Sequence, residues 1–237
     1  WQMERHLSSP FTLELVNVTT LVAVEAHPPE NLTYAGGLIA RQNATLSFMW
    51  DTAGLKDCNF TGWQMEMLAP FVNATWEWVP ECDNATMETP NCTVAEGLVT
   101  NSQYGLRLRA RCIDPKAVGP WLEANVTTLP IPAESPKATL RALDPHSLLL
   151  EWAAKDPGEC IFRSWRILPS PNLIVTECES EPRSNESRCV LMEALSNETY
   201  EIQVCEACTD PLADSPCALV HDTTPLAPAE PPHSLSV

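Results

Sequence analysis

The chain has 237 residues, a mass of 26.2 kDa, a formal net charge of −17, 22 prolines, 8 glycines and 10 cysteines. This length suits one large domain or two ordinary ones. The charge disfavours nucleic acid as a partner, because phosphate backbones are bound by clustered lysines and arginines. No apolar run approaches the ~18 residues of a membrane span, and scarce glycine disfavours a nucleotide enzyme built on a glycine-rich loop.

Asparagine stands unusually often at the start of the triplet Asn-x-Ser/Thr, the acceptor of N-linked glycans. Ten of the 12 asparagines begin such a triplet, against a chance expectation of roughly two. They are Asn17, Asn31, Asn43, Asn59, Asn73, Asn84, Asn91, Asn125, Asn185 and Asn197. The set predicts a secreted or extracellular chain that carries N-linked glycans, and the even number of cysteines agrees with an oxidising compartment.

Alternating apolar and polar residues predict β-strands along the whole chain. No helical stripe of any length is present, and a proline about every ten residues would break one. The class is therefore predicted to be all-β. In chain order, the inward-facing sets are Leu46, Phe48 and Trp50; Trp63, Met65 and Met67; Tyr104, Leu106, Leu108 and Ala110; Leu148, Leu150 and Trp152; and Tyr200, Ile202 and Val204.

Two groups of side chains lie outside this inward pattern. Trp76 and Trp78 are two residues apart on a short strand, so their rings share a face, and a place at the edge of the core is favoured over an interface patch. Arginines at three alternate positions project from the outward face of one strand, and Trp121 follows near the start of the next strand. The spacing predicts a stacked ladder of this tryptophan with Arg107, Arg109 and Arg111.

Rare residues recur at matched offsets, so the chain contains a repeat. A Trp is followed by Cys after 8 residues and by a second Trp after 13; a Tyr is followed by Cys after 8 and by Thr after 23. The tryptophan sets begin at Trp50 and Trp152, and the tyrosine sets begin at Tyr104 and Tyr200. The resulting unit of about 100 residues has the size of an immunoglobulin-like sandwich.

The segment between units also recurs. Asn-Val-Thr-Thr-Leu occurs at 17–21 and at 125–129, and a third Thr-Thr pair lies at 223–224. A proline follows eight residues after each pair, at Pro28, Pro136 and Pro232. The pattern predicts two whole units with part of another at either end.

These features together resemble the fibronectin type III domain: a proline at the start of the unit, a Trp ending the second strand, the pattern Tyr-x-Leu-x-Leu-x-Ala, and a last strand ending in Thr-Thr. The resemblance implies tandem immunoglobulin-like (fibronectin type III) β-sandwiches joined by Pro-rich linkers. It implies complete modules at 28–130 and 131–227. Residues 1–27 are expected to be the end, the last strand, of a preceding or neighbour-completed module, and 228–237 the start of a following one.

The many cysteines depart from the usual type III module. In a type III sandwich, the loop after the Trp strand meets the end of the Tyr strand, which implies one disulfide there in each module. The other cysteines would then close local loops and one hairpin. The implied pairs are Cys58 with Cys112, Cys82 with Cys92, Cys160 with Cys208, Cys178 with Cys189, and Cys205 with Cys217.

Catalytic patterns are missing from the sequence. Cys205-Glu206-Ala207-Cys208 has the spacing of a redox motif, but it ends a strand rather than opening a helix in a βαβ unit. We find no nucleophile elbow, no phosphate-binding glycine loop and no paired metal-ligand motif. The sequence therefore predicts a protein that is not an enzyme and needs no cofactor or metal.

Two function classes remain. The first is an extracellular structural glycoprotein, a segment or subunit of a fibre or surface coat, whose partners are neighbouring modules or copies of itself, through strand complementation or an end-to-end array. Stiff linkers such as Leu129-Pro130-Ile131-Pro132 favour it. The alternative is the ectodomain of a cell-surface adhesion protein or receptor that binds a protein partner through its loops. Ten glycan acceptors leave little surface for a large interface, so the structural class is favoured.

Overall fold

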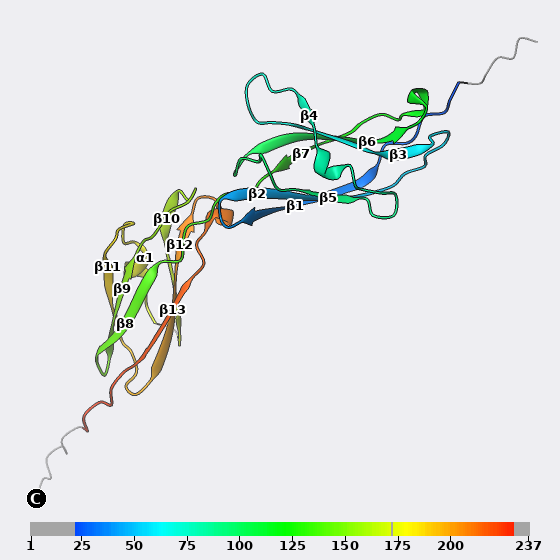
Figure 1. The fold of residues 1–237 in the computed structure, drawn as a ribbon. Coiled ribbons are helices and arrows are strands. Elements are labelled where there is room, and N and C mark those ends of the chain that lie inside the picture. Colours follow the sequence, from blue (N-terminus) through cyan, green and yellow to red (C-terminus); the bar gives the residue numbers. More distant parts are fainter. Residues whose placement is uncertain (1–21, 172, 230–237) are drawn as a thin grey trace, which may run out of the picture.

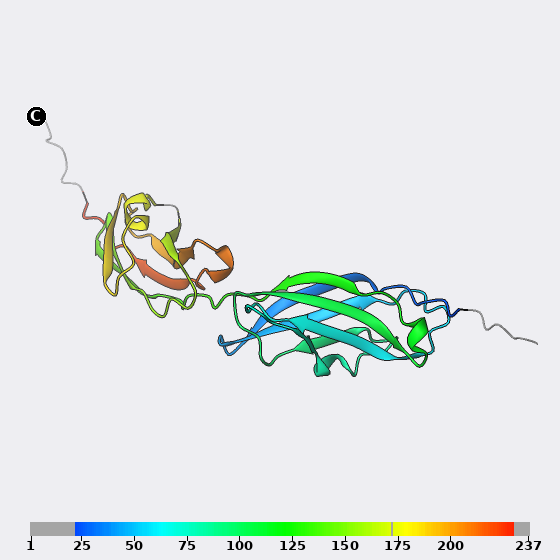
Figure 2. The ribbon, with the colours of Figure 1, turned by 90° about the horizontal axis from the view of Figure 1, so that it is seen from above.

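The computed structural model describes residues 22–171 and 173–229, which form two β-sandwiches. The sandwiches lie end to end and give an elongated molecule (Figures 1 and 2). Each packs two antiparallel sheets around a hydrophobic core of its own. The all-β class and the arrangement as tandem sandwiches are confirmed.

The first sandwich contains seven strands. One sheet has the order β1-β2-β5 and the opposite sheet the order β4-β3-β6-β7. The strand bounds are β1 (Glu30–Ile39), β2 (Asn43–Asp51), β3 (Phe60–Leu68), β4 (Trp76–Trp78), β5 (Asn91–Val94), β6 (Gln103–Cys112) and β7 (Leu122–Thr127). Two short 3-10 turns, Pro80–Cys82 and Pro115–Ala117, connect strands.

The second sandwich repeats this order with six strands. Its sheets are β11-β9-β8 and β10-β12-β13. The bounds are β8 (Lys137–Asp144), β9 (Ser147–Ala153), β10 (Phe162–Ser170), β11 (Ser187–Met192), β12 (Thr199–Cys208) and β13 (Ala218–Thr223). In the region where the first sandwich has β4, the second has the single-turn helix α1 (Thr176–Glu179), and a 3-10 turn at Pro211–Ala213 precedes β13.

The predicted alternation places the large side chains in the two cores. On β2, Leu46, Phe48 and Trp50 are at most 2% exposed, whereas Ser47 and Met49 between them face solvent. Trp50 meets Trp63 edge to face, with ring centroids 5.6 Å apart. The second core repeats this contact with the pair Trp152 and Trp165 at 5.9 Å. Such edge-to-face pairs add about 0.5–1.5 kcal/mol beyond their area burial.

A tyrosine and a threonine close the end of each sandwich at which the chain leaves it. The Tyr104 hydroxyl accepts a hydrogen bond from the backbone N–H of Val99 at 2.7 Å, and Tyr200 does the same for Leu195 at 2.8 Å. The predicted Thr-Thr repeat is part of the same corner, because the Thr128 hydroxyl donates to the carbonyl of Val99 at 2.7 Å. The tyrosine corner is a hallmark of immunoglobulin-like sandwiches.

The first sandwich begins before the predicted boundary at residue 28. Ala26 is 2% exposed within the first core, and its N–H donates to the Ala117 carbonyl at 2.9 Å. Residues 1–21 of the predicted end of a preceding module lie outside the described residues, as does 230–237 of the predicted following module. No helix in the described part of the chain is long and apolar enough to cross a membrane.

Candidate functional site: the joint and the arginine-tryptophan face

The chain enters each sandwich through the same kind of contact, a backbone N–H that donates to an acidic side chain. Asp57 lies immediately before Cys58, and its carboxylate accepts a hydrogen bond from the N–H of Val24 at 2.8 Å. Glu159 lies immediately before Cys160 and accepts from the N–H of Ile131 at 2.7 Å. In each case the backbone also pairs in the other direction, from the acidic residue's N–H to the carbonyl of the incoming residue. Hydrogen bonds to a charged acceptor are stronger than neutral ones, so they hold the entering chain firmly.

Side chains of the first sandwich bind the entry to the second, and we call this set of contacts the joint. Thr100 donates to the second carboxylate oxygen of Glu159 at 2.9 Å. Arg41, in the turn between β1 and β2, pairs with Glu134 at 2.7 Å and donates to the Pro132 carbonyl at 2.5 Å. The Arg41 and Glu134 side chains are 39% and 41% exposed, so their ion pair orients the joint more than it stabilises the fold.

Gly158 allows two segments of the chain to approach each other closely at the joint. Its φ is +54°, in the left-handed region, and a Cβ there would lie 2.5 Å from the Ile131 carbonyl oxygen and 2.8 Å from that of Pro132. Any other side chain would have to displace backbone, because glycine alone has no Cβ. The joint therefore depends on a glycine as well as on the charged contacts.

The outer face of the β4-β3-β6-β7 sheet carries the predicted ladder. The Arg107 guanidinium lies between two rings, 4.5 Å from the centroid of Trp76 and 4.4 Å from that of Trp121. Arg109 stacks on the same Trp121 ring at 4.0 Å, and Arg111 lies 5.3 Å from Trp78. The predicted stacking of Arg107 and Arg109 on Trp121 is confirmed, but the prediction was wrong for Arg111, which lies over Trp78 instead.

Polar side chains of β3 pair with the ladder arginines. Glu66 forms an ion pair with Arg107, and Gln64 accepts from Arg109 at 2.9 Å while donating to Glu66 at 2.7 Å. Burial, helped by the neighbouring charge of Arg107, lowers the pKa of Arg109, and Glu66 opposes the shift. The face is thus a closed network in which each guanidinium plane is matched by a ring or a polar partner.

The expectation that Trp76 and Trp78 belong to the core edge is wrong. Trp76 is half-buried and Trp78 is 38% exposed, and both rings pack on guanidinium groups at the outer face. Strand β4 is short and pairs only with the end of β3, from Leu68 to Glu66. Its rings therefore extend over the outer face of the sheet, where the arginines supply their contact.

All nine predicted glycan acceptors within the described residues are exposed. Asn17 lies outside those residues. Asn125 faces out from β7, opposite Gly105, at one end of the ladder face. The remaining exposed acceptors are Asn31, Asn43, Asn59, Asn73, Asn84, Asn91, Asn185 and Asn197. Each can carry a bulky, solubilising glycan without disturbing a core.

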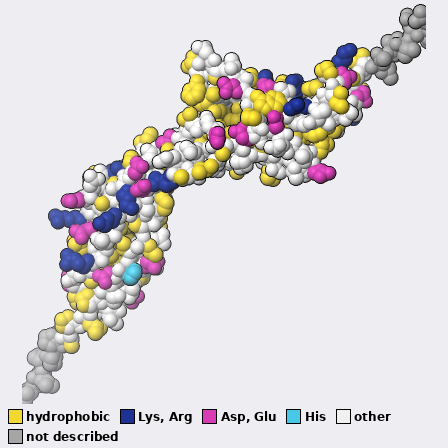
Figure 3. All heavy atoms as spheres, in the orientation of Figure 1, with side chains coloured by type: hydrophobic (Ala, Val, Ile, Leu, Met, Phe, Trp, Pro, Cys, Tyr) yellow, Lys and Arg dark blue, Asp and Glu magenta, His cyan; other side chains and the backbone are white. Residues whose placement is uncertain are grey.

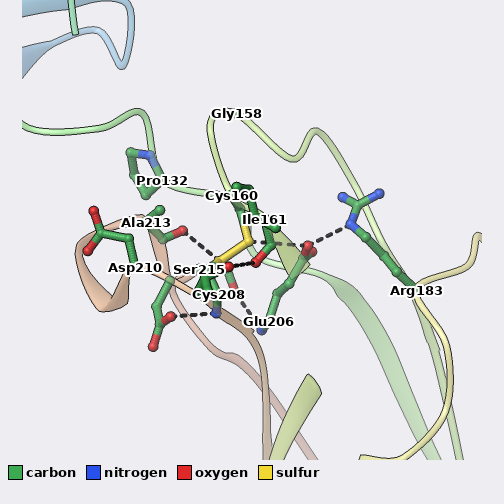
Figure 4. The surroundings of a disulfide bond; sticks show 12 residues. Pro132, Gly158, Cys160, Ile161, Arg183, Glu206, Cys208, Asp210, Ala213 and Ser215 are labelled. Carbon is green, nitrogen blue, oxygen red and sulfur yellow. Dashed lines mark hydrogen bonds and ion pairs between the residues drawn. A yellow bond between two sulfur atoms is a disulfide. The ribbon is translucent and has the colours of Figure 1, made fainter. Parts of the chain in front are cut away.

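The structure joins all ten cysteines, each within the described residues, in five disulfides. The pairs are Cys58–Cys112, Cys82–Cys92, Cys160–Cys208, Cys178–Cys189 and Cys205–Cys217. The first and third occupy equivalent places beside the chain entry, and Figure 4 shows the surroundings of Cys160–Cys208. Cys205, on β12, is fully buried.

Sequence reasoning missed the residues of the joint. A signal for Glu159 was present, because an acidic residue precedes the equivalent cysteine in both repeats, at Asp57 and Glu159. Nothing local marked Arg41 or Thr100, which are 118 and 59 residues from Glu159 in the chain. Contacts between distant side chains follow only from how the two sandwiches are placed.

No protein-family model matches the chain, and no curated protein sequence matches it. Among solved structures, it is similar to the FN1-FN3 domains of chicken CNTN1, with 19% identity, a TM-score of 0.42, and coverage of 88% of this chain and 70% of that one. It is also similar to the chicken interferon gamma receptor alpha chain, with 14% identity, a TM-score of 0.44, and coverage of 84% and 98%.

A two-domain fibronectin type III segment of chicken tenascin is a third similar structure, with 14% identity, a TM-score of 0.40, and coverage of 83% of this chain and 99% of that one. Within residues 22–171 and 173–229, the second sandwich has the strand order of the first except that it has no counterpart of β4.

Proposed function

We propose that this chain is a segment or subunit of an extracellular structural glycoprotein, a fibre or surface coat, in which type III modules act as struts. The observation that carries the proposal is the joint. Arg41 and Thr100 connect the first sandwich to the linker and to Glu159 of the second through separate contacts. A link held at two places resists bending more than a simple tether does, which suits a part that transmits force or sets spacing.

The cysteines and the glycan acceptors support an extracellular place. Disulfides persist in oxidising compartments and are rare in the cytosol. Five of them in two modules of about 100 residues add to a stability that a secreted protein needs. Nine exposed Asn-x-Ser/Thr asparagines would give the strut a solubilising coat in spite of its few lysines and arginines.

The stiffness of the joint can be tested by small-angle X-ray scattering of the glycosylated protein. We expect Arg41→Ala combined with Thr100→Ala to broaden the distribution of interatomic distances, because the sandwiches then bend about the linker. Arg163→Ala, at an exposed position of β10, is the matched control and leaves the scattering unchanged. Scattering of the double variant identical to that of the native protein would contradict the proposed strut.

Electron microscopy of native material tests the assembly. Filaments with an axial repeat of two modules support the fibre or coat, and dispersed single molecules support the second candidate, an adhesion or receptor ectodomain. One observation favours that candidate. The loop between β3 and β4 projects from the first sandwich (Figure 1), and its Phe71 and Val72 are 64% and 92% exposed. Exposed apolar tips of this kind are typical of contacts with a protein partner.

A further inference from the structure

A hollow of about 740 Å³ lies on the outer face of the β11-β9-β8 sheet. Its volume falls within the range of about 300–1,000 Å³ that small-ligand sites occupy. The hollow is lined by Lys137, Thr139, Glu151, Trp152, Ala153, Asn185, Glu186, Ser187 and Arg188. None of these residues belongs to the joint or to the ladder.

The register of the sheet explains the hollow. Ala153 on β9 lies opposite Lys137 on β8, and its short side chain leaves a depression beside the long one. In the next outward-facing row, Glu151 lies opposite both Thr139 on β8 and Arg188 on β11. Long side chains around one alanine thus form the walls. Figure 3 shows basic and acidic side chains interspersed on this side of the second sandwich.

The lining suits a neutral ligand rich in hydroxyl groups. Lys137 and Arg188 contribute two positive charges, and Glu151 and Glu186 two negative ones, so neither an anion nor a cation is favoured. Within residues 22–171 and 173–229, the side chains of Lys137, Glu151 and Arg188 make no hydrogen bond or ion pair with another residue. They remain available as donors and acceptors for sugar hydroxyl and acetamido groups.

A glycan acceptor lies at the rim of the hollow, and a glycan on it would supply such a ligand. Asn185 begins the triplet Asn185-Glu186-Ser187, lines the hollow and is exposed. Its position is fixed, because the Ser184 carbonyl accepts from the N–H of Ala154 at 2.9 Å and the Ser184 and Ser187 hydroxyls are 3.0 Å apart. A sugar attached there has an effective concentration in the millimolar range or above, so weak contacts suffice to hold it.

We propose that this hollow seats the first sugar residues of an N-linked glycan on Asn185. The seat rests on the proposed glycoprotein function and assigns one of its glycans a fixed place on the second sandwich. The bound sugars cover Lys137 and the β9 strand between β8 and β11. This glycan then acts as part of the folded surface, whereas the glycans on loops extend into solvent.

The test measures how fast Lys137 is acetylated by an amine-reactive ester, with peptide mass spectrometry to follow each lysine. The chain has four lysines, and Lys56 and Lys116 in the first sandwich serve as internal references. In the glycosylated protein we expect Lys137 to react several-fold more slowly than in the variant Asn185→Gln and than in the enzymatically deglycosylated native protein. Asn125→Gln, which removes an acceptor from β7, is the matched control and leaves the Lys137 rate unchanged.

Three results would overturn the seat. Equal Lys137 rates with and without a glycan on Asn185 would show that the sugars point away from the hollow. An unmodified Asn185 beside other occupied acceptors would remove this glycan but leave the glycoprotein function intact. Unmodified asparagines at every acceptor would contradict the glycoprotein function itself. Slower reaction of Lys137 only when Asn185 carries a glycan, independent of protein concentration, supports the proposal and excludes sugars supplied by another molecule.

Discussion

The Glu206 carboxylate is fully buried, and Arg183 donates to it from Nε at 2.6 Å. Figure 4 shows the arginine reaching this carboxylate beside the Cys160–Cys208 disulfide. The second carboxylate oxygen has no hydrogen-bond partner among the described residues. Glu206 lies opposite Trp165, where the first sandwich places Ala110 opposite Trp63. The second core therefore contains a charge that the first core does without.

Removing the cation should destabilise the second sandwich strongly. Arg183→Met leaves the buried carboxylate unpaired, and breaking one partner of such a pair costs about 3–5 kcal/mol. The double variant R183M/E206A removes both charges and gives the second sandwich the residue that the first has, so most of the loss should be recovered. Hydrogen exchange of the β12 amides measures the effect. Equal protection in the native protein and in Arg183→Met would contradict the role of the pair.

The ladder predicts that Arg107 cannot be replaced by lysine without loss. Lysine keeps the charge but lacks the planar group that lies between Trp76 and Trp121. With about 0.5–1 kcal/mol for each contact, Arg107→Lys should cost about 1–2 kcal/mol of the unfolding free energy of the first sandwich. Arg163→Lys on the exposed surface is the control. Urea unfolding followed by tryptophan fluorescence measures both, and equal losses would show that stacking is not the cause.

Asp144 makes the turn between β8 and β9 sensitive to acid. The Ser147 hydroxyl donates to its carboxylate at 2.6 Å and the His146 N–H at 2.7 Å. The Ser147 bond, followed by the His146 bond, lowers the pKa of Asp144 below its ordinary value of 3.8. A carboxyl with a lowered folded-state pKa stabilises the fold above its unfolded-state pKa, and this contribution is lost as the pH falls through the folded-state value.

Asp144→Asn should therefore unfold more easily than the native protein at pH 7, and the difference should shrink as the pH falls below 3.8. Thermal melts across this range measure it. Asp210→Asn is an informative control, because Asp210 also accepts a backbone N–H, from Leu212, but lies in another turn. A difference that is the same at every pH would show that the carboxylate charge plays no part in the turn.

The disulfides should differ in their contribution to stability according to the length of chain that each closes. Cys58–Cys112 spans 54 residues and Cys205–Cys217 spans 12. The loop-entropy relation gives about 4 kcal/mol for the first and about 3 kcal/mol for the second. Replacing both cysteines of each pair with alanine and measuring urea midpoints tests this order. A larger loss for the shorter loop would mean that native-state packing outweighs chain entropy.

Much of the fold could be read from local pattern. Strand alternation placed Phe48 and Trp50 in the core, and matched offsets from Trp50 and Trp152 located the two sandwiches before any contact was known. These features depend on a period of two and on spacings along one chain, which are properties of neighbouring residues. The stacking of Arg107 on Trp121 was also predictable, because Arg107 lies on β6 and Trp121 immediately precedes the adjacent strand β7.

The sequence by itself determined the class, the repeat and the positions of cysteines and glycan acceptors, since each is written in composition and spacing. Only the tertiary structure decided what joins the sandwiches, where the rings of Trp76 and Trp78 lie, and that Glu206 meets Arg183. The hollow around Ala153 belongs with these, because β11, which is distant in sequence from the β8-β9 hairpin, helps to build it. Such contacts depend on the relative placement of whole elements, which no local pattern specifies.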